Sequence, residues 1–202
     1  MLAIPDHLAA LHALRDAALS LIATVPDLNA FAPAPEDLQL QDCPALLVPG
    51  VDHLLADCGT AAPQTEAFVA CVRRAAPFAN WQRTYTEAQV GADFMARYGW
   101  FELWGPSGHF LSDTARAYVA FWGAGLTYGW HWHEAEEIYF IGSGAALFRG
   151  EGMADAILHT GDTRLHLSNQ PHAMDTTDQP ILALVLWRGA GLSGVPYMPE
   201  PA

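Results

Sequence analysis

The stretch YGWHWHEAEEIYF, residues 128–140, places two histidines one residue apart, three acids within four residues and a tyrosine two positions after the last acid. Successive side chains on a β-strand point to opposite faces. The residues with chemically active side chains share odd numbers: His131, His133, Glu137 and Tyr139. On strands they would therefore converge on one interior, while Ile138 and Phe140 would pack as ordinary apolar residues on the other face.

Imidazoles and a carboxylate that converge on a β scaffold suit a divalent metal ion. Imidazole nitrogen binds zinc, iron, nickel or copper, and a carboxylate adds charge. A further ligand should come from another strand, and His172 is the candidate because it follows a turn proline and precedes the final strand. The alternative is a hydrogen-bonded polar cluster without metal.

Tyr139 lies one inward position beyond Glu137, close enough to touch a metal or its substrate. A divalent cation stabilises a nearby phenolate, and a phenolate can act as a general base. The alternative is a tyrosine hydrogen-bonded in the core. Trp187 shares a strand face with Ala183 and Val185, and either core packing or a place in the site would explain it.

From about residue 82 the chain consists of short runs of aromatic and aliphatic residues divided by glycine-containing turns. These runs are RYGWFELWG, ARAYVAFWGAG, EEIYFIGSG, AALFRGEG, DAILHTGD, TRLHLS and PILALVLWRG. Regularly spaced short strands of this kind predict a β-sandwich or barrel.

Residues 1 to about 80 are expected to be mainly helical. Apolar side chains recur every three or four residues from Leu8 to Leu21, and this helix should end at Val25 because Pro26 follows. DHLLADCG (52–59) and TEAFVACVRRAAP (65–77) predict two shorter helices. We therefore expect a helical N-terminal extension (1–80) on a β-barrel (81–202), within one folding unit.

The net charge of the chain argues against some classes of binding partner. The 202 residues carry 22 acids against nine cations, a net charge of −13, and every cation is arginine. Such a surface repels nucleic acid and anionic membranes. No apolar run approaches the roughly 18 residues of a membrane span, and the first residues lack the basic segment of a signal peptide.

The cysteines indicate the compartment. The chain has three, Cys43, Cys58 and Cys71, without CxxC spacing. They are expected as free thiols, with a disulfide as the alternative, so a cytoplasmic location is predicted.

The histidine-rich stretch also matches a known motif. Gly125, five residues, His131, one residue, His133, three residues, Glu137, six residues and Gly144 reproduce the first cupin motif. The second motif is partial, because Gly161 and His172 are correctly spaced while Leu167, Asn169 and Thr176 replace the usual proline, glycine and asparagine. This resemblance covers about residues 100–190 and implies a cupin double-stranded β-helix barrel with one metal inside.

Together with a helical N-terminal segment of this length, the stretch resembles the cupin-type dimethylsulfoniopropionate (DMSP) lyases of marine bacteria, particularly the Q-type enzymes. In that family a tyrosine two residues after the glutamate ligand removes a Cα proton acidified by the metal-bound carboxylate, and dimethyl sulfide leaves from Cβ to give acrylate. The resemblance implies metal ligands His131, His133, Glu137 and His172, the base Tyr139, and substrate-binding residues Tyr128 and Trp187.

The implied substrate is a small zwitterionic sulfonium, and the cofactor is one divalent ion: Zn²⁺, Fe²⁺, Mn²⁺, Ni²⁺ or Co²⁺. The N-terminal helices could act as a lid, cover the barrel mouth or form a homodimer contact. His159 and His166 are expected to be structural residues at strand edges, and the alternative is that they support the site residues from behind. Two other functions use the same ligand set: an iron-dependent cupin dioxygenase, and a non-catalytic metal- or ligand-binding cupin. A Tyr139→Phe change separates them, because only the lyase requires the phenol.

Overall fold

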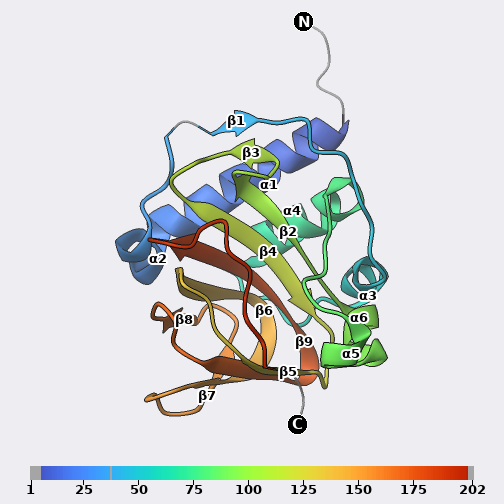
Figure 1. Ribbon diagram of the computed structural model, residues 1–202. Helices are drawn as coiled ribbons and strands as arrows, with labels where there is room; N and C mark the ends of the chain where they lie inside the picture. The colour runs from blue at the N-terminus through green and yellow to red at the C-terminus, as the bar shows by residue number, and fades with distance from the viewer. Residues whose placement is uncertain (1–5, 37, 200–202) are drawn as a thin grey trace, which may run out of the picture.

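The computed structural model describes residues 6–36 and 38–199 (Figure 1). Its N-terminal helices are α1 (Asp6–Thr24), α2 (Pro26–Phe31), α3 (Gly50–Ala56), α4 (Glu66–Ala75) and the 3₁₀ helix η1 (Ala76–Phe78). The first helix ends beside Val25 as predicted, and Pro26 opens the next at a position whose N–H would have no helical partner. The two shorter predicted helices are α3 and α4. None of the described helices is long and apolar enough to cross a membrane.

The remaining chain is mainly β. Its strands are β1 (Gln39–Leu40), β2 (Tyr98–Gly105), β3 (Phe110–Leu111), β4 (Arg116–Trp122), β5 (Thr127–His131), β6 (Glu136–Gly150), β7 (Ala156–His159), β8 (Thr163–His166) and β9 (His172–Arg188). They pair in the order β1-β3-β2-β4-β9-β6-β7, with β5 on β9 and β8 on β6. β1 falls within the segment expected to be helical.

Two long strands, β6 and β9, run through both halves of this arrangement. The first half of β6 pairs with β8 and the end of β9, and its second half pairs with β7 and the start of β9. The β6–β9 register shifts at Gly144, whose φ is 83° and whose missing Cβ leaves room for the carbonyl of Pro180. The result is two sheets that share β6 and β9: a larger sheet that also contains β1, β3, β2, β4 and β8, and a smaller sheet that also contains β5 and β7. This confirms the expected mainly β cupin fold with an N-terminal helical extension, although the described strands do not close into a complete barrel.

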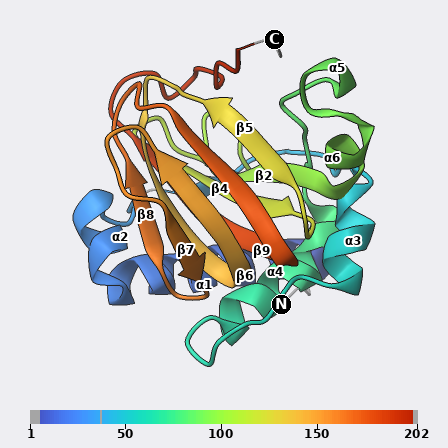
Figure 2. The ribbon, with the colours of Figure 1, turned by 90° about the horizontal axis from the view of Figure 1, so that it is seen from below.

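One face of the larger sheet is covered by helices, and we call it the helix-covered face. Its apolar side chains form one buried cluster with residues of α1 to α4, and Ile138 and Phe140 belong to it as expected. α3 packs on β2 and β4, and α4 packs on β6. Figure 2 shows α1 and α4 on one side of these strands, away from β5.

The opposite face points into the space between the sheets, and we call it the cavity face. A second buried cluster joins aromatic residues of β2 and β4, such as Tyr98 and Trp122, to residues of the smaller sheet, such as Phe148 and Met174. The residues singled out in the sequence lie on or beside this face.

Three details differ from the sequence-based expectation. EEIYFIGSG and AALFRGEG form one strand, β6, because the glycines at 142 and 144 bend it without breaking it. β9 likewise starts eight residues before Pro180. Helices α5 (Glu87–Val90) and α6 (Ala92–Arg97) were not expected, although Thr86 and Gln89 carry a capping signal: the Thr86 N–H donates to Gln89 Oε1 at 3.0 Å. The three cysteines are free thiols, as predicted.

Candidate active site

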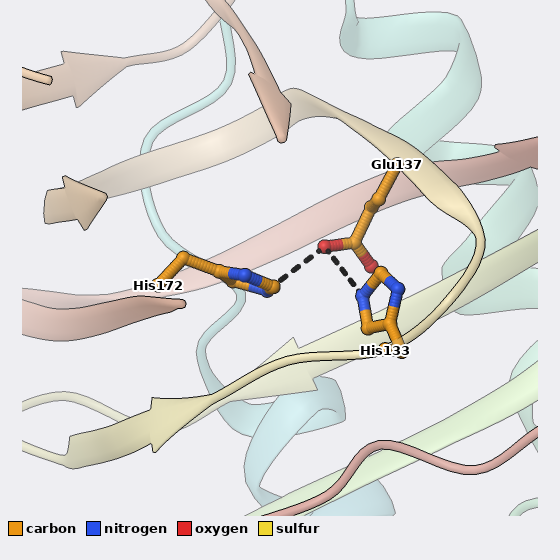
Figure 3. Close-up of side chains that lie close together, drawn as sticks. All are labelled: His133, Glu137 and His172. Atoms are coloured by element: carbon orange, nitrogen blue, oxygen red, sulfur yellow. Dashed lines mark ion pairs between the residues drawn. The ribbon is translucent and has the colours of Figure 1, made fainter. Parts of the chain in front are cut away.

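His133, Glu137 and His172 converge in the interior from three parts of the chain, and we call them the ligand triad (Figure 3). His133 follows β5, Glu137 lies on β6 and His172 begins β9. Glu137 Oε2 lies 3.4 Å from His133 Nε2 and 3.2 Å from His172 Nε2. All three residues are at most 5% exposed.

The backbone fixes the tautomer of each motif histidine. Nδ1 of His131, His133 and His172 lies 2.8–2.9 Å from the carbonyl oxygen of Gly129, Ala135 and Gln170, respectively. A carbonyl only accepts, so each Nδ1 must donate. In the neutral imidazole the Nε2 lone pair is then free for a metal.

The three triad atoms that face one another lack other partners. His133 Nε2, His172 Nε2 and Glu137 Oε2 are buried without a hydrogen bond among the described residues, while Glu137 Oε1 accepts a 2.7 Å bond from Trp187 Nε1. Burial raises the pKa of Glu137, but the adjacent His133 and His172 outweigh it and hold that pKa well below its usual value. Two aligned nitrogens and an ionised oxygen, all within 4.8 Å, are a donor set that fits a divalent cation.

His131 lies beside the triad but outside that group of three. Its ring stacks on Tyr128 with 4.0 Å between centroids and lies 4.1 Å from the ring of His172. Burial, together with the neighbouring His172, holds the pKa of His131 well below its usual value, so the ring is neutral. Its role as a further ligand stays a prediction.

His166, which the sequence placed at a strand edge, is a neighbour of the triad. It lies on β8 directly opposite Glu137, is fully buried, and stacks on His172 with 4.0 Å between ring centroids. Neither ring nitrogen has a hydrogen-bond partner among the described residues, and burial lowers the pKa to about 3. A neutral ring therefore packs against the flat face of His172. Only the β6–β8 register reveals this contact.

Two residues that depart from the second cupin motif, Asn169 and Thr176, make hydrogen bonds that hold the surrounding loops. Asn169 replaces the usual glycine and adopts a φ of 56°, a left-handed conformation that asparagine tolerates. Its N–H donates to the carbonyl of His133 at 2.8 Å and so links the two motifs. Thr176 replaces the usual asparagine, and its hydroxyl accepts from Leu126 N–H and donates to the Gly123 carbonyl, both at 2.7 Å.

Tyr139 and Glu137 line a cavity of about 440 Å³. Tyr139 is 4% exposed, and its ring lies against Phe148, Trp122 and His166. Burial and the Glu137 carboxylate raise the pKa of its phenol well above the usual value. A base at this position therefore depends on positive charge nearby.

The predicted substrate-binding residues, Tyr128 and Trp187, line the same cavity. The Trp187 ring stacks on His133 with 4.2 Å between centroids, so it contacts the ligand triad as well as the cavity. The hydroxyls of Tyr128 and Tyr85 lie 2.7 Å apart. The rings of Tyr85 and Tyr98 also pack against Tyr128. Tyr85 lies in the segment before β2 and Tyr98 is the first residue of β2, and the sequence did not connect either residue to the site.

Comparison with known proteins agrees with this arrangement. A family model for DMSP lyase matches residues 28–183. The DMSP lyase DddQ of Ruegeria pomeroyi is 38% identical over 182 residues, 90% of each chain. Its crystal structure superposes with a TM-score of 0.90 and 37% identity, covering 96% of this chain and 98% of that one. A chain from the crystal structures of the DMSP lyases RdDddP and RnDddQII reaches a TM-score of 0.94 and 49% identity, covering 96% and 100%.

Proposed function

Because the chain belongs to the DMSP lyase family, we propose that it is a metal-dependent carbon–sulfur lyase that converts DMSP to dimethyl sulfide and acrylate by β-elimination. The observation that carries the proposal is the 38% identity over 90% of both chains to a DMSP lyase. The reaction needs no redox partner and no added water. A Cα–H bond and the Cβ–S bond break, and a Cα=Cβ bond forms.

The proposed metal ligands are the triad residues, with His131 as a further ligand. The support is the set of buried, unpartnered nitrogen and oxygen atoms together with the histidine tautomers. When bound, a divalent cation acts as a Lewis acid on the substrate carboxylate and lowers the pKa of a neighbouring phenol.

Tyr139 is the proposed base. It shares the cavity face with Glu137, and both line the cavity. As phenolate it takes the Cα proton, the C–H electron pair becomes the new π bond, and dimethyl sulfide leaves with the electrons of the Cβ–S bond. The phenol then returns its proton to solvent before the next turnover.

Tyr128 and Trp187 are proposed to bind the substrate. Both present aromatic surface to the cavity, and an aromatic face attracts a sulfonium cation by about 0.5–2 kcal/mol. In Trp187 the indole N–H is already used by Glu137 and one ring face stacks on His133, so the rest of the ring is left for the ligand.

Purified protein incubated with DMSP tests the proposal, with dimethyl sulfide followed by gas chromatography and acrylate by NMR. We expect equal amounts of both products, loss of activity with a chelator, recovery on adding a divalent ion, and no oxygen consumption. Product release that survives complete metal removal contradicts metal dependence. Absence of dimethyl sulfide from metal-loaded protein contradicts the lyase proposal.

A further inference from the structure

The cavity contains a buried ion pair that the elimination does not use. Arg116 Nε on β4 lies 3.6 Å from Glu102 Oε1 on β2, and these side chains are 11% and 7% exposed. Both line the cavity that also reaches Glu137 and Tyr139. Replacing a buried ion pair by apolar residues is often neutral for stability, so its presence in a cavity wall is better explained by a ligand.

The local backbone is shaped around Glu102. A β-bulge follows it on β2, so Trp104 turns to the helix-covered face and Glu102 is the last β2 residue on the cavity face. The Ser107 N–H donates to Glu102 Oε1 at 3.2 Å. A Cβ at Gly105 would clash with this carboxylate oxygen. Because Ser107 is exposed and lines the cavity, Glu102 lies at the solvent end.

Strand register connects this end of the cavity to the ligand triad. Arg116, Trp187 and Glu137 form one cross-strand row. Glu102, Tyr118, Val185 and Tyr139 form the next row. With strands about 4.8 Å apart, Arg116 and Glu137 are separated by about 10 Å along the sheet.

Aromatic rings line the intervening surface. Tyr118 meets Trp187 edge to face at 5.3 Å between centroids, and Trp100 meets Tyr118 in the same way at 5.3 Å. Arg116 Nη1 donates to the Tyr118 hydroxyl at 2.8 Å and so fixes that ring against the ion pair. A ligand with its carboxylate at the triad would point its other end along these rings toward Glu102.

We propose that Trp100, Tyr118 and the carboxylate of Glu102 form an onium subsite, which selects small methylated cations such as sulfonium or quaternary ammonium groups. The aromatic faces attract the soft cation, and the pairing of Glu102 with Arg116 leaves no net positive charge at this end of the cavity to repel it. Arg116 is a positioning residue that holds Glu102 in place, and Glu102 in turn neutralises a guanidinium that would repel the ligand. The assignment of this subsite to the sulfonium end of DMSP rests on the proposed function.

Two small molecules test the binding of each end of the substrate by itself. Trimethylsulfonium has the cation without a carboxylate, and 3-(methylthio)propanoate has the carboxylate without the cation. In titration calorimetry, Glu102→Gln should weaken trimethylsulfonium binding about tenfold and leave binding of the acid within about twofold. In turnover, KM for DMSP should rise about tenfold while kcat changes less than about twofold.

Two further variants make the result decisive. Trp100→Leu removes a ring without changing charge and should weaken the cation but not the acid, which decides the matter if Glu102→Gln does not fold. Asp93→Asn removes one acid from an exposed pair with Arg97 and should change neither affinity. Unchanged trimethylsulfonium binding in a folded subsite variant, or an equal loss for both probes, overturns the subsite. Wild-type protein that binds the cation in this pattern but releases no dimethyl sulfide keeps the subsite and overturns the proposed reaction.

Discussion

Tyr139 and Phe140 are neighbours on β6 and are both buried, yet they belong to different parts of the molecule. Phe140 lies in the apolar cluster under the helices, and Tyr139 lies in the cluster around the cavity. β4 alternates in the same way: Val119 and Phe121 face the helices, while Arg116 and Tyr118 face the cavity. One set of strands thus carries packing on one face and chemistry on the other.

The two faces also differ in polar content. Buried side-chain atoms without a hydrogen-bond partner occur in several residues of the site: Arg116, Trp122, His133, Glu137, His166 and His172. Unpartnered buried polar groups cost stability, so the helix-covered face must supply the folding energy that offsets them. Substitutions on the two faces should therefore change different measurements.

Tyr139→Phe should give the largest separation of activity from stability. Loss of a general base lowers kcat by about 10²–10⁴, equivalent to about 3–5.5 kcal/mol at the transition state. The ring is retained, so the melting temperature and metal content should match those of wild type. Dimethyl sulfide release and metal analysis of the same sample check both points. A variant with wild-type kcat removes Tyr139 from the mechanism.

Phe140→Ala, at the next residue of β6, should lower stability and leave kcat nearly unchanged. Truncation of a phenylalanine that is 1% exposed costs about 3–5 kcal/mol of unfolding free energy, because a cavity is left under the helices. Denaturant unfolding measures this loss. At a temperature where the variant is still folded, its kcat should stay within about twofold of wild type, and a kcat loss as large as that of Tyr139→Phe contradicts the division between faces.

His109 should make the helix-covered side sensitive to pH. The residue is buried beside Phe101, and its Nε2 accepts the Asn80 N–H at 3.1 Å. Burial lowers its pKa from 6.5 to about 4. The unfolded chain therefore binds the proton more tightly, and about 3 kcal/mol of stability, fully present above pH 6.5, is lost as the pH falls toward 4.

Urea unfolding at a series of pH values measures this dependence. His109→Gln keeps an acceptor for Asn80 but cannot titrate, so its stability should fall less between pH 6.5 and 4 than that of wild type. Equal slopes for the two proteins show that His109 is not the source.

Trp187→Phe should have the smallest effect of the four. The stack on His133 is kept and the N–H donor to Glu137 is lost, so metal affinity or activity should fall by about 10–100-fold, roughly 1.4–2.7 kcal/mol. Metal titration measures the affinity, and steady-state kinetics measure kcat.

The matched control is Trp81→Phe, which removes an indole N–H that donates to the Ala76 carbonyl on the helix-covered face. That variant should lose some stability and bind metal normally.

Much of the prediction of which side chains share the site came from odd and even residue numbers along a strand. These numbers assigned Glu137 and Tyr139 to one face and Ile138 and Phe140 to the other, because a strand alternates strictly. The spacing of the first cupin motif led to the fold, and His172 could be named because its distance from Gly161 follows the second motif. Local sequence patterns were enough to assign these residues to the site or to the apolar core.

Other site residues depend on contacts that no local pattern encodes. His166 reaches His172 only through the pairing of β8 with β6, and Glu102 is the last cavity-facing residue of β2 because a bulge follows it. Tyr85 precedes α5 and α6, two short helices whose packing decides where the segment lies. Register, bulges and loop packing are set by tertiary structure, so local patterns placed His166 only at a strand edge and did not connect Glu102 or Tyr85 to the site.

The two strands shared by both sheets also determine how the chain can fold. Glu137 pairs with Trp187, fifty residues later, and Gly150 pairs with His172 on the same two strands. Neither sheet is complete until this non-local pairing has formed, which favours slow folding in a single cooperative transition. His133, Glu137 and His172 lie on or beside the strands joined by this pairing, so a folding intermediate without the pairing would lack the proposed metal site. Newly made chains should therefore bind metal only at the last step.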